Sequence, residues 1–518
     1  MSSALYARNV VATSQSLAAQ AGLHALRRGG NAVDAAVATA IALTVVEPVS
    51  NGVGGDLFAI VWDRGQIHGL NASGCAPAAL DLGDYRGVDH IPLTGWSSVA
   101  VPGAVSGWAA LNRQFGKLSF KDLFEAAIDY AAHGFPVGPV VAAKWAREAH
   151  RLKDEPGFLE VFAPEGKTPS VGECFRNPQL ARTLHLLADS AGAALYEGEI
   201  GKSLVRHACT FGGKLSLDDL KDHHVMAQKP LSVRYRDCDV WQLPPNGQGL
   251  AALLGMGLLD RFERPKGEAQ WLHLQAECVK MSFAQMYPYL ADERHLVQPP
   301  SYWLQASVLD ALAQKISHHQ ADSYGAAKPP WGGTVYITTG DAQGQVVSLI
   351  QSTFFGFGAG VTDPNTGVHL NNRLACFSLD PGHPNVAAGK KRPMNTIIPG
   401  FVTRAGQALY ALGVTGGPIQ PQGQMQLLTK LIDDKWGPQE AVEAKRWKIE
   451  HARGDTQLDL EPGFDPVLAE DLRTRGHRQD APGITGMDFG GAYALQCRDN
   501  GVYVAGNDPR RDGAAVGF

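Results

Sequence analysis

A threonine preceded by two glycines, Gly332-Gly333-Thr334, is the feature of this sequence with the clearest chemical potential. A threonine at the start of a chain supplies a hydroxyl nucleophile and, beside it, a free α-amine whose ordinary pKa of roughly 8 suits a base. The two glycines leave the preceding backbone room to bend while the threonine oxygen attacks the carbonyl before it. We therefore predict that the chain cuts itself between Gly333 and Thr334 and then uses Thr334 as its nucleophile.

The residues before this threonine form the most loop-like stretch in the middle of the chain. The stretch from Ala321 to Gly333 contains Pro329-Pro330 as well as the two glycines, so we expect an exposed connection that is open to cleavage. A Gly-Gly-Thr tripeptide is nevertheless common, and by itself it favours an ordinary loop leading into a β-strand. The motifs elsewhere in the chain must therefore decide between a catalytic threonine and an ordinary strand residue.

A predicted hairpin follows the threonine. Residues 334–339 and 345–352 are β-prone runs separated by a compact turn that ends in glycine. Centring the hairpin on this turn places Thr334 opposite Gln351 or Ser352, so the Ser352 hydroxyl could hydrogen-bond the nucleophile. A shift of one residue would turn Ser352 to the other face, which leaves a plain serine at a strand end as the alternative.

A second glycine pair, Gly416-Gly417, joins a β-like run to a helix-like segment at residues 425–433. Backbone N–H groups at such a turn can point at an anion, and an oxyanion forms when an amide carbonyl is attacked. An isolated glycine pair is more simply explained as a tight turn. Both interpretations stay open from the residues alone.

The surrounding pattern predicts one α/β unit. Residues 14–46 are typical of a helical hairpin in which Gly29-Gly30 ends the first helix and Asn31 begins the second. Residues 57–62 have the apolar and β-branched content of a strand, and the region from about 104 to 320 is mainly helical. We find no internal repeat, and we expect the strands to come together from distant parts of the chain.

Charge and cysteine usage exclude several classes of function. The 518 residues carry 46 basic against 51 acidic side chains, so no basic field favours nucleic acid or an anionic membrane as a partner. The start of the chain lacks the pattern of a secretory signal, and we expect a cytoplasmic protein. The seven cysteines lie far apart without a Cys-x-x-Cys pair, so we expect no disulfide framework, no metal site and no cofactor.

Several ordered motifs make the chain resemble the gamma-glutamyltransferase superfamily of self-processing threonine hydrolases over nearly its whole length. The motifs that carry this resemblance are residues 29–36, 47–56, 334–344, 367–372, 391–393, 416–417 and 508–513. The resemblance implies a four-layer α/β/β/α sandwich of the N-terminal-nucleophile hydrolase type over residues 1–518. It also implies self-cleavage into a heterodimer of residues 1–333 and 334–518, with a dimer of such heterodimers as a further option.

The resemblance also assigns roles to single residues. The position matching Thr334 is both cleavage site and nucleophile, and the position matching Ser352 carries a supporting hydroxyl. The glycines matching Gly416 and Gly417 form the oxyanion hole. These roles agree with the chemistry that the residues suggest on their own.

The residues that recognise a gamma-glutamyl group in the family are largely replaced. Its carboxylate-binding arginine is matched by Ser73, and the aspartate that holds the substrate ammonium is matched by Cys376. An asparagine is replaced by Phe354, whereas a pair of serines is matched by Asn395 and Thr396, which keep hydrogen-bonding ability. These losses argue against a zwitterionic amino-acid substrate.

A new cation, Arg373, stands where the family usually has a neutral or acidic side chain. Its guanidinium fork would suit a small anionic acyl group, with a plain surface arginine as the equal alternative. We therefore expect an amide hydrolase for a small anion without an amine. Among relatives without glutamyl recognition, the resemblance implies oxamate, cleaved to oxalate and ammonia in purine-nitrogen salvage. The rival hypotheses are gamma-glutamyl hydrolysis or transfer on glutathione and a non-catalytic, unprocessed binding protein.

Overall fold

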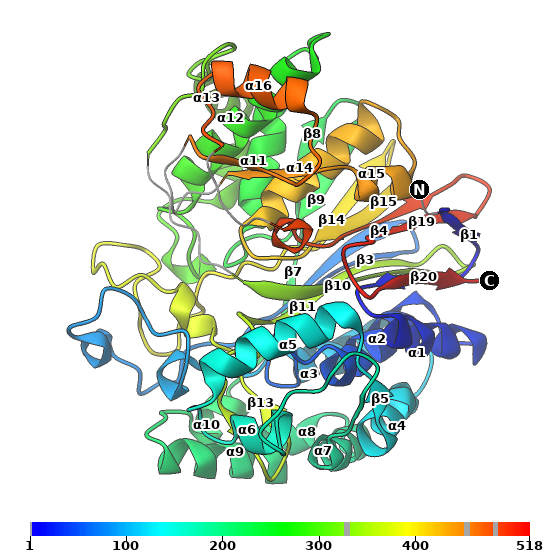
Figure 1. The fold of residues 1–518 in the computed structure, drawn as a ribbon, viewed down its shortest axis with the longest axis vertical. Helices are drawn as coiled ribbons and strands as arrows, with labels where there is room; N and C mark the ends of the chain where they lie inside the picture. The colour runs from blue at the N-terminus through cyan, green and yellow to red at the C-terminus, as the bar shows by residue number, and fades with distance from the viewer. Residues whose placement is uncertain (1–2, 326–331, 450–455, 480–484) are drawn as a thin grey trace.

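The computed structural model describes residues 3–325, 332–449, 456–479 and 485–518 (Figure 1). Part of the predicted cleavable connection, residues 326–331, lies outside the described residues. Within that connection, residues 321–325 belong to no helix or strand, whereas Gly333 is already the first residue of strand β10 (Gly333–Gly340).

Two seven-stranded antiparallel sheets form the centre of the molecule. The first sheet contains, in order, β20 (Ala514–Gly517), β2 (Val10–Thr13), β10 (Gly333–Gly340), β11 (Val346–Phe354), β3 (Asp56–Asp63), β4 (Gln66–Ala72) and β7 (Met226–Gln228). The second contains β1 (Leu5–Ala7), β19 (Tyr503–Asn507), β18 (Ala492–Cys497), β15 (Gln407–Val414), β14 (Gly400–Arg404), β9 (Cys238–Gln242) and β8 (Leu231–Tyr235).

Apolar side chains from both sheets meet in a shared core. Phe58 and Tyr336 of the first sheet lie in one buried cluster with Phe401 and Tyr493 of the second, and the Tyr336 and Tyr493 rings stack with centroids 5.9 Å apart. Such a core is typical of two sheets packed face to face.

Helices cover the outer face of each sheet, as Figure 1 shows. The first sheet packs on α1 (Ser16–Arg27), α2 (Ala32–Val46) and α3 (Ala104–Phe115), and the second on α11 (Gly249–Leu259) and α14 (Ile419–Ile432). Further out, α4 (Glu125–His133) packs on α2 and α12 (Glu268–Met286) packs on α11. The predicted four-layer α/β/β/α sandwich is therefore confirmed.

Shorter elements complete the layers. The remaining helices are α5 (Pro139–Leu152), α6 (Phe158–Phe162), α7 (Pro178–Asp189), α8 (Ala193–Tyr196), α9 (Glu199–Thr210), α10 (Leu217–Lys221), α13 (Ala306–Ala313), α15 (Pro438–Glu443) and α16 (Pro466–Thr474). Three small strand pairs join β5 (Phe135–Pro136) to β6 (Cys174–Phe175), β12 (Thr362–Asp363) to β13 (Val368–His369), and β16 (Trp447–Ile449) to β17 (Leu458–Leu460).

The predicted helical hairpin is confirmed as α1 and α2. Gly29 adopts a positive φ of 90° between the two helices, and Asn31 caps α2 in a reciprocal box with Asp34. All residues of α2 are buried, which explains its uninterrupted apolar sequence. Among the described residues, no helix combines the length and the apolar character needed to cross a membrane.

The predicted β-hairpin is confirmed as β10 and β11. Val335 pairs with Gln351, whereas Gly333 pairs with Phe354, so a bulge interrupts the register between these pairs. One residue of β10, Thr334, therefore faces two residues of β11. Ser352 is one of the two, which is one of the two registers that the sequence predicts.

Candidate active site

The carbonyl oxygen of Gly333 accepts hydrogen bonds from two hydroxyl groups. Thr334 Oγ1 and Ser352 Oγ each donate to it over 2.6 Å. Ser352 and Thr334 thus meet through a shared acceptor. When a nucleophile attacks the Gly333 carbonyl, negative charge develops on this oxygen, and the Ser352 hydroxyl is placed to stabilise it.

The bulge beside Thr334 depends on an unusual backbone conformation at Phe354. This residue has φ of 80°, a left-handed conformation that costs a side-chain-bearing residue about 1–3 kcal/mol and persists only where its surroundings hold it. The Phe354 N–H donates to Ser352 Oγ over 2.7 Å, and a Cβ on Gly332 would lie 3.1 Å from the Phe354 ring. Phe354 therefore packs directly under the peptide that precedes Thr334.

The glycine pair Gly416-Gly417 lies between β15 and α14 in left-handed conformations, with φ of 113° and 64°. Among the described residues, neither amide N–H has a hydrogen-bond acceptor. Gly416 lines the same cavity as Thr334, and a Cβ on Gly332 would lie 3.4 Å from Gly417 Cα. Two free backbone donors beside the peptide that precedes Thr334 are what an oxyanion hole requires.

Gln420 was not predicted from the sequence as part of this site. Its Nε2 donates to Thr334 Oγ1 over 3.3 Å, and its Oε1 accepts the Ile398 N–H over 3.1 Å. The position of Gln420 in the first turn of α14, three residues after Gly417, is the only sequence signal that could have indicated it.

Arg373 is fully buried, so the surface-arginine alternative is wrong. Its Nε donates to Asp56 Oδ2 over 2.7 Å, and its Nη1 donates to Thr396 Oγ1 over 3.1 Å. The guanidinium carbon lies 4.8 Å from the centre of the Phe354 ring. Nη2 has no hydrogen-bond partner among the described residues, so both N–H groups of this nitrogen are unused.

The other residues that replace the family's gamma-glutamyl-binding groups lie in the same corner of the protein, around Arg373 and Asp56. Asn395 Nδ2 donates to Asp56 Oδ2 over 3.1 Å, and Ser73 Oγ donates to Asn71 Oδ1 over 2.7 Å. Cys376 Sγ lies 3.8 Å from Arg373 Nη1, and burial raises the pKa of this thiol to about 11. No carboxylate in this described corner is left to hold a substrate ammonium, because Asp56 already pairs with Arg373.

A cavity of about 250 Å³ opens beside Thr334. Three of its wall residues are cations: Lys144, Arg147 and Arg511. Burial, together with the nearby Arg511, lowers the pKa of Lys144 to about 8. The Arg511 guanidinium donates to the carbonyl oxygens of Arg510 and Met487 and pairs with no carboxylate among the described residues.

Both carboxylates on the wall of this cavity have partners. Glu148 is held by Arg147 and Arg151 over 3.0 and 2.9 Å. Asp488 accepts the Thr485 N–H and hydroxyl over 2.8 and 2.9 Å. Lys144 also lies 3.6 Å from the Glu47 carboxylate, and Arg147 pairs with Glu148. Arg511 is therefore the wall cation that has no carboxylate partner among the described residues.

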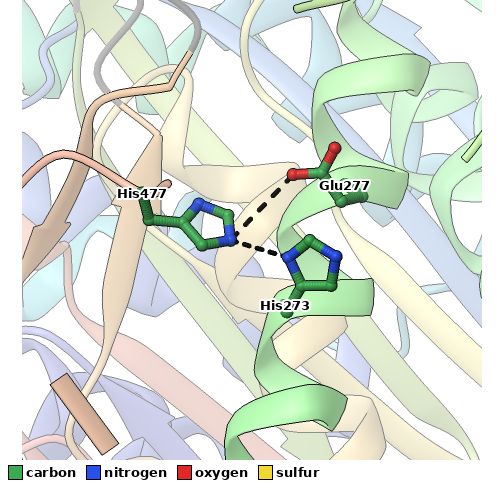
Figure 2. A group of neighbouring side chains, drawn as sticks. All are labelled: His273, Glu277 and His477. Carbon is green, nitrogen blue, oxygen red and sulfur yellow. Dashed lines mark hydrogen bonds and ion pairs between the residues drawn. The ribbon is translucent and has the colours of Figure 1, made fainter. Parts of the chain in front are cut away.

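One cluster away from Thr334 has the residue types of a metal site. Figure 2 shows His273, Glu277 and His477, whose ligand atoms lie within 4.8 Å of one another. His273 Nδ1 and His477 Nε2 are 2.9 Å apart in a hydrogen bond, His273 Nε2 bonds the Ser317 carbonyl oxygen, and Lys280 Nζ lies 2.5 Å from Glu277 Oε1. The lysine ammonium already supplies the positive charge, so this donor set fits a buried hydrogen-bond network better than a metal.

Comparisons with known proteins agree with this geometry. The sequence model of the gamma-glutamyltranspeptidase family matches residues 18–518. The oxamate amidohydrolase proenzyme of Klebsiella pneumoniae is 35% identical, over 97% of this chain and 97% of that protein. The glutathione hydrolase-like YwrD proenzyme of Bacillus subtilis is 34% identical, over 99% and 98%. The crystal structure of a cephalosporin acylase from Bacillus halodurans superposes with a TM-score of 0.95 at 38% identity, over 100% of this chain and 97% of that one.

Proposed function

This chain belongs to the gamma-glutamyltranspeptidase family, and from that premise we propose that it hydrolyses a small anionic amide, oxamate above all, through an acyl-Thr334 intermediate. Members of the family are amide-cleaving enzymes with an N-terminal nucleophile, and the chain is such an enzyme. The hypothesis of a non-catalytic binding protein is therefore wrong.

We propose that the mature enzyme arises by self-cleavage at Gly333–Thr334. The two hydroxyls on the Gly333 carbonyl oxygen support this step, and the names of the two relatives contain the word proenzyme. The fragments would stay together as a heterodimer, because β10 and β11 of residues 334–518 lie between β2 and β3 of residues 1–333 in one sheet.

The mechanism follows from the groups around Thr334. The freed α-amine takes the hydroxyl proton as Oγ1 attacks the substrate carbonyl, and the Gly416 and Gly417 N–H groups receive the oxyanion. The C–N bond breaks, the proton passes to the leaving nitrogen, and oxamate loses ammonia. Water then attacks the ester on Thr334, which releases oxalate and restores the hydroxyl.

The observation that carries the substrate proposal is the pairing of the charged groups near Thr334. A gamma-glutamyl substrate has an ammonium group that needs a carboxylate, yet Asp56 and Glu148 already pair with arginines and Glu47 pairs with Lys144. Arg511 on the cavity wall pairs with no carboxylate among the described residues. Nη2 of Arg373, which packs against the Phe354 ring, has no hydrogen-bond partner among them. An anion without an amine suits these surroundings.

We propose that Arg373, Asn395, Thr396 and Phe354 form the floor of the acyl pocket. In the uncleaved chain, Gly332 lies over the Phe354 ring. Departure of the cleaved end would open the floor to a small acyl group. Arg373 Nη2 would then bind the substrate carboxylate once the Phe354 ring turns aside.

A second candidate is hydrolysis or transfer of a gamma-glutamyl group from glutathione. The similarity to the YwrD proenzyme, named glutathione hydrolase-like, favours it almost as strongly as the oxamate relative favours the first. It would require anchors for the glutamyl ammonium other than Cys376 and Asp56.

Ammonia release from oxamate and glutamate release from glutathione, measured on the same purified enzyme, decide between these functions. We expect a kcat/KM for oxamate well above that for glutathione. Thr334→Ala is the inactive control for both reactions. Preference for glutathione would overturn the proposal.

A further inference from the structure

We propose that Gln420 is a further catalytic residue, which holds the Thr334 hydroxyl in place during both self-cleavage and turnover. This inference rests on the proposed role of Thr334 as the nucleophile. Its basis is a direct contact, in which the Gln420 amide donates to Thr334 Oγ1 over 3.3 Å.

The orientation of the Gln420 amide follows from its second partner. Oε1 lies 3.1 Å from the backbone nitrogen of Ile398, and this N–H can only donate. The carbonyl end of the Gln420 side chain must therefore face Ile398, so the NH₂ end must face Thr334. Gln420 is fully buried, and the low local polarity strengthens both hydrogen bonds.

This contact organises the nucleophile. Because Thr334 Oγ1 accepts the Gln420 N–H, its own hydrogen is directed elsewhere, in the uncleaved chain to the Gly333 oxygen over 2.6 Å. In the mature enzyme that hydrogen is available to the α-amine of Thr334. An N–H donor on Oγ1 also stabilises the negative charge that this oxygen gains as its proton leaves.

Gln420 also couples the nucleophile to the oxyanion donors. It is the second residue of α14 and lies three residues after Gly417, so the nucleophile's donor and the two backbone N–H groups belong to one continuous segment. Gln248 Nε2 steadies the same turn by donating to the Gly417 carbonyl oxygen over 3.0 Å. The relative positions of Thr334 and the glycine pair are thus set by rigid neighbours.

A matched control lies one helical turn further along α14. Gln424 is equally buried, and its Nε2 donates to the carbonyl oxygen of the same residue, Ile398, over 2.8 Å. Its Oε1 accepts from Gln242 over 2.6 Å. Gln424 therefore supports the same segment as Gln420 but has no contact with Thr334.

The test compares Gln420→Leu, Gln420→Glu and Gln424→Leu. The glutamate keeps the shape of glutamine but replaces the NH₂ donor with an acceptor. We measure the self-cleavage time course on gels, kcat and KM for oxamate on the processed enzyme, and Tm. Both Gln420 variants should cleave slowly and lose about tenfold to a hundredfold in kcat with little change in KM. Gln424→Leu should retain cleavage and kcat even where its Tm falls.

Two outcomes overturn the inference. One is a processed Gln420→Glu enzyme with wild-type kcat and cleavage rate. The other is a Gln424→Leu enzyme that slows as much as the Gln420 variants at a similar Tm, which would make the effect structural. Failure of the proposed function is distinguishable, because then Thr334→Ala would still cleave or turn over whatever the Gln420 variants do.

Discussion

Thr334 Oγ1 and Ser352 Oγ share one acceptor, the carbonyl oxygen of Gly333, each at 2.6 Å. This relationship places both hydroxyls at the bond that self-cleavage must break. In the uncleaved chain Ser352 hydrogen-bonds this carbonyl oxygen, and the self-cleavage that we propose would leave its hydroxyl beside Thr334.

Self-cleavage is the first expectation from this geometry. Purified wild type should give two fragments, and the smaller should begin Thr-Val-Tyr-Ile on N-terminal sequencing. Thr334→Ala removes the attacking oxygen and should remain one chain, whereas Thr334→Ser keeps a hydroxyl and should still cleave. Any other N-terminal sequence would make Thr334 the wrong nucleophile.

Ser352→Ala should slow both cleavage and turnover, because it removes one donor from the Gly333 oxygen and a hydroxyl beside Thr334. A loss of about tenfold to a thousandfold is the range for one such group. Thr353→Val is the matched control, since the Thr353 hydroxyl lies at the same bulge, buried and without a partner among the described residues. Wild-type rates in Ser352→Ala would remove this residue from the mechanism.

The sequence predicted contacts between residues close together in the chain better than contacts between residues far apart in it. The hairpin of β10 and β11 has a two-fold side-chain period and a short turn, so the sequence could place Ser352 beside Thr334 across it. The contact of Gln420 with Thr334 joins residues 86 positions apart, and the Arg373–Asp56 pair spans 317 positions. Such contacts depend on how the two sheets pack, so a buried Arg373 could not be told from a surface arginine by sequence.

Arg373→Met should weaken oxamate binding, but the structure adds a cost to stability. It leaves the buried Asp56 carboxylate without its partner, which typically destabilises a protein by about 3–5 kcal/mol. The double variant Asp56→Asn/Arg373→Met should recover part of the lost Tm. If Arg373 binds the substrate carboxylate, KM for oxamate should rise about tenfold to a hundredfold in both variants, since a charge-assisted contact is worth about 1.5–3 kcal/mol. A neutral amide should be affected much less, and unaltered oxamate kinetics would remove Arg373 from the substrate site.

Lys144→Met tests whether the cations on the wall of the cavity beside Thr334 recognise the substrate. Lys144 lines the cavity beside Thr334, so loss of its charge should raise KM for oxamate while leaving kcat for a neutral amide near wild type. Lys167→Met is a suitable control, because Lys167 is exposed and lies outside this cavity. Equal KM values for both variants would mean that the substrate charge is recognised elsewhere.

Acid should destabilise the fold through the histidine pair of Figure 2. Burial, assisted at His477 by the nearby Lys280, lowers the pKa of His273 to about 4 and that of His477 to about 2, from an ordinary 6.5. Glu277 is the one carboxylate in contact with this pair among the described residues, and Lys280 already pairs with it. Both imidazoles therefore stay neutral in the folded protein but take up protons near pH 6.5 when it unfolds.

The sign follows from proton uptake by the unfolded chain. The stabilisation is fully present above about pH 6.5 and is lost as the pH falls toward 4, by about 1.4 kcal/mol per pH unit for each histidine. Tm of the uncleaved Thr334→Ala chain should therefore fall steeply from pH 7 to pH 5, a background that excludes any contribution from fragment dissociation. His477→Gln removes one titrating group and should flatten this dependence, whereas His90→Gln, at an exposed position, should leave it unchanged. A His477→Gln chain whose Tm falls as steeply as that of its parent would show that this pair does not set the acid limit, because the slope depends only on groups that gain protons on unfolding.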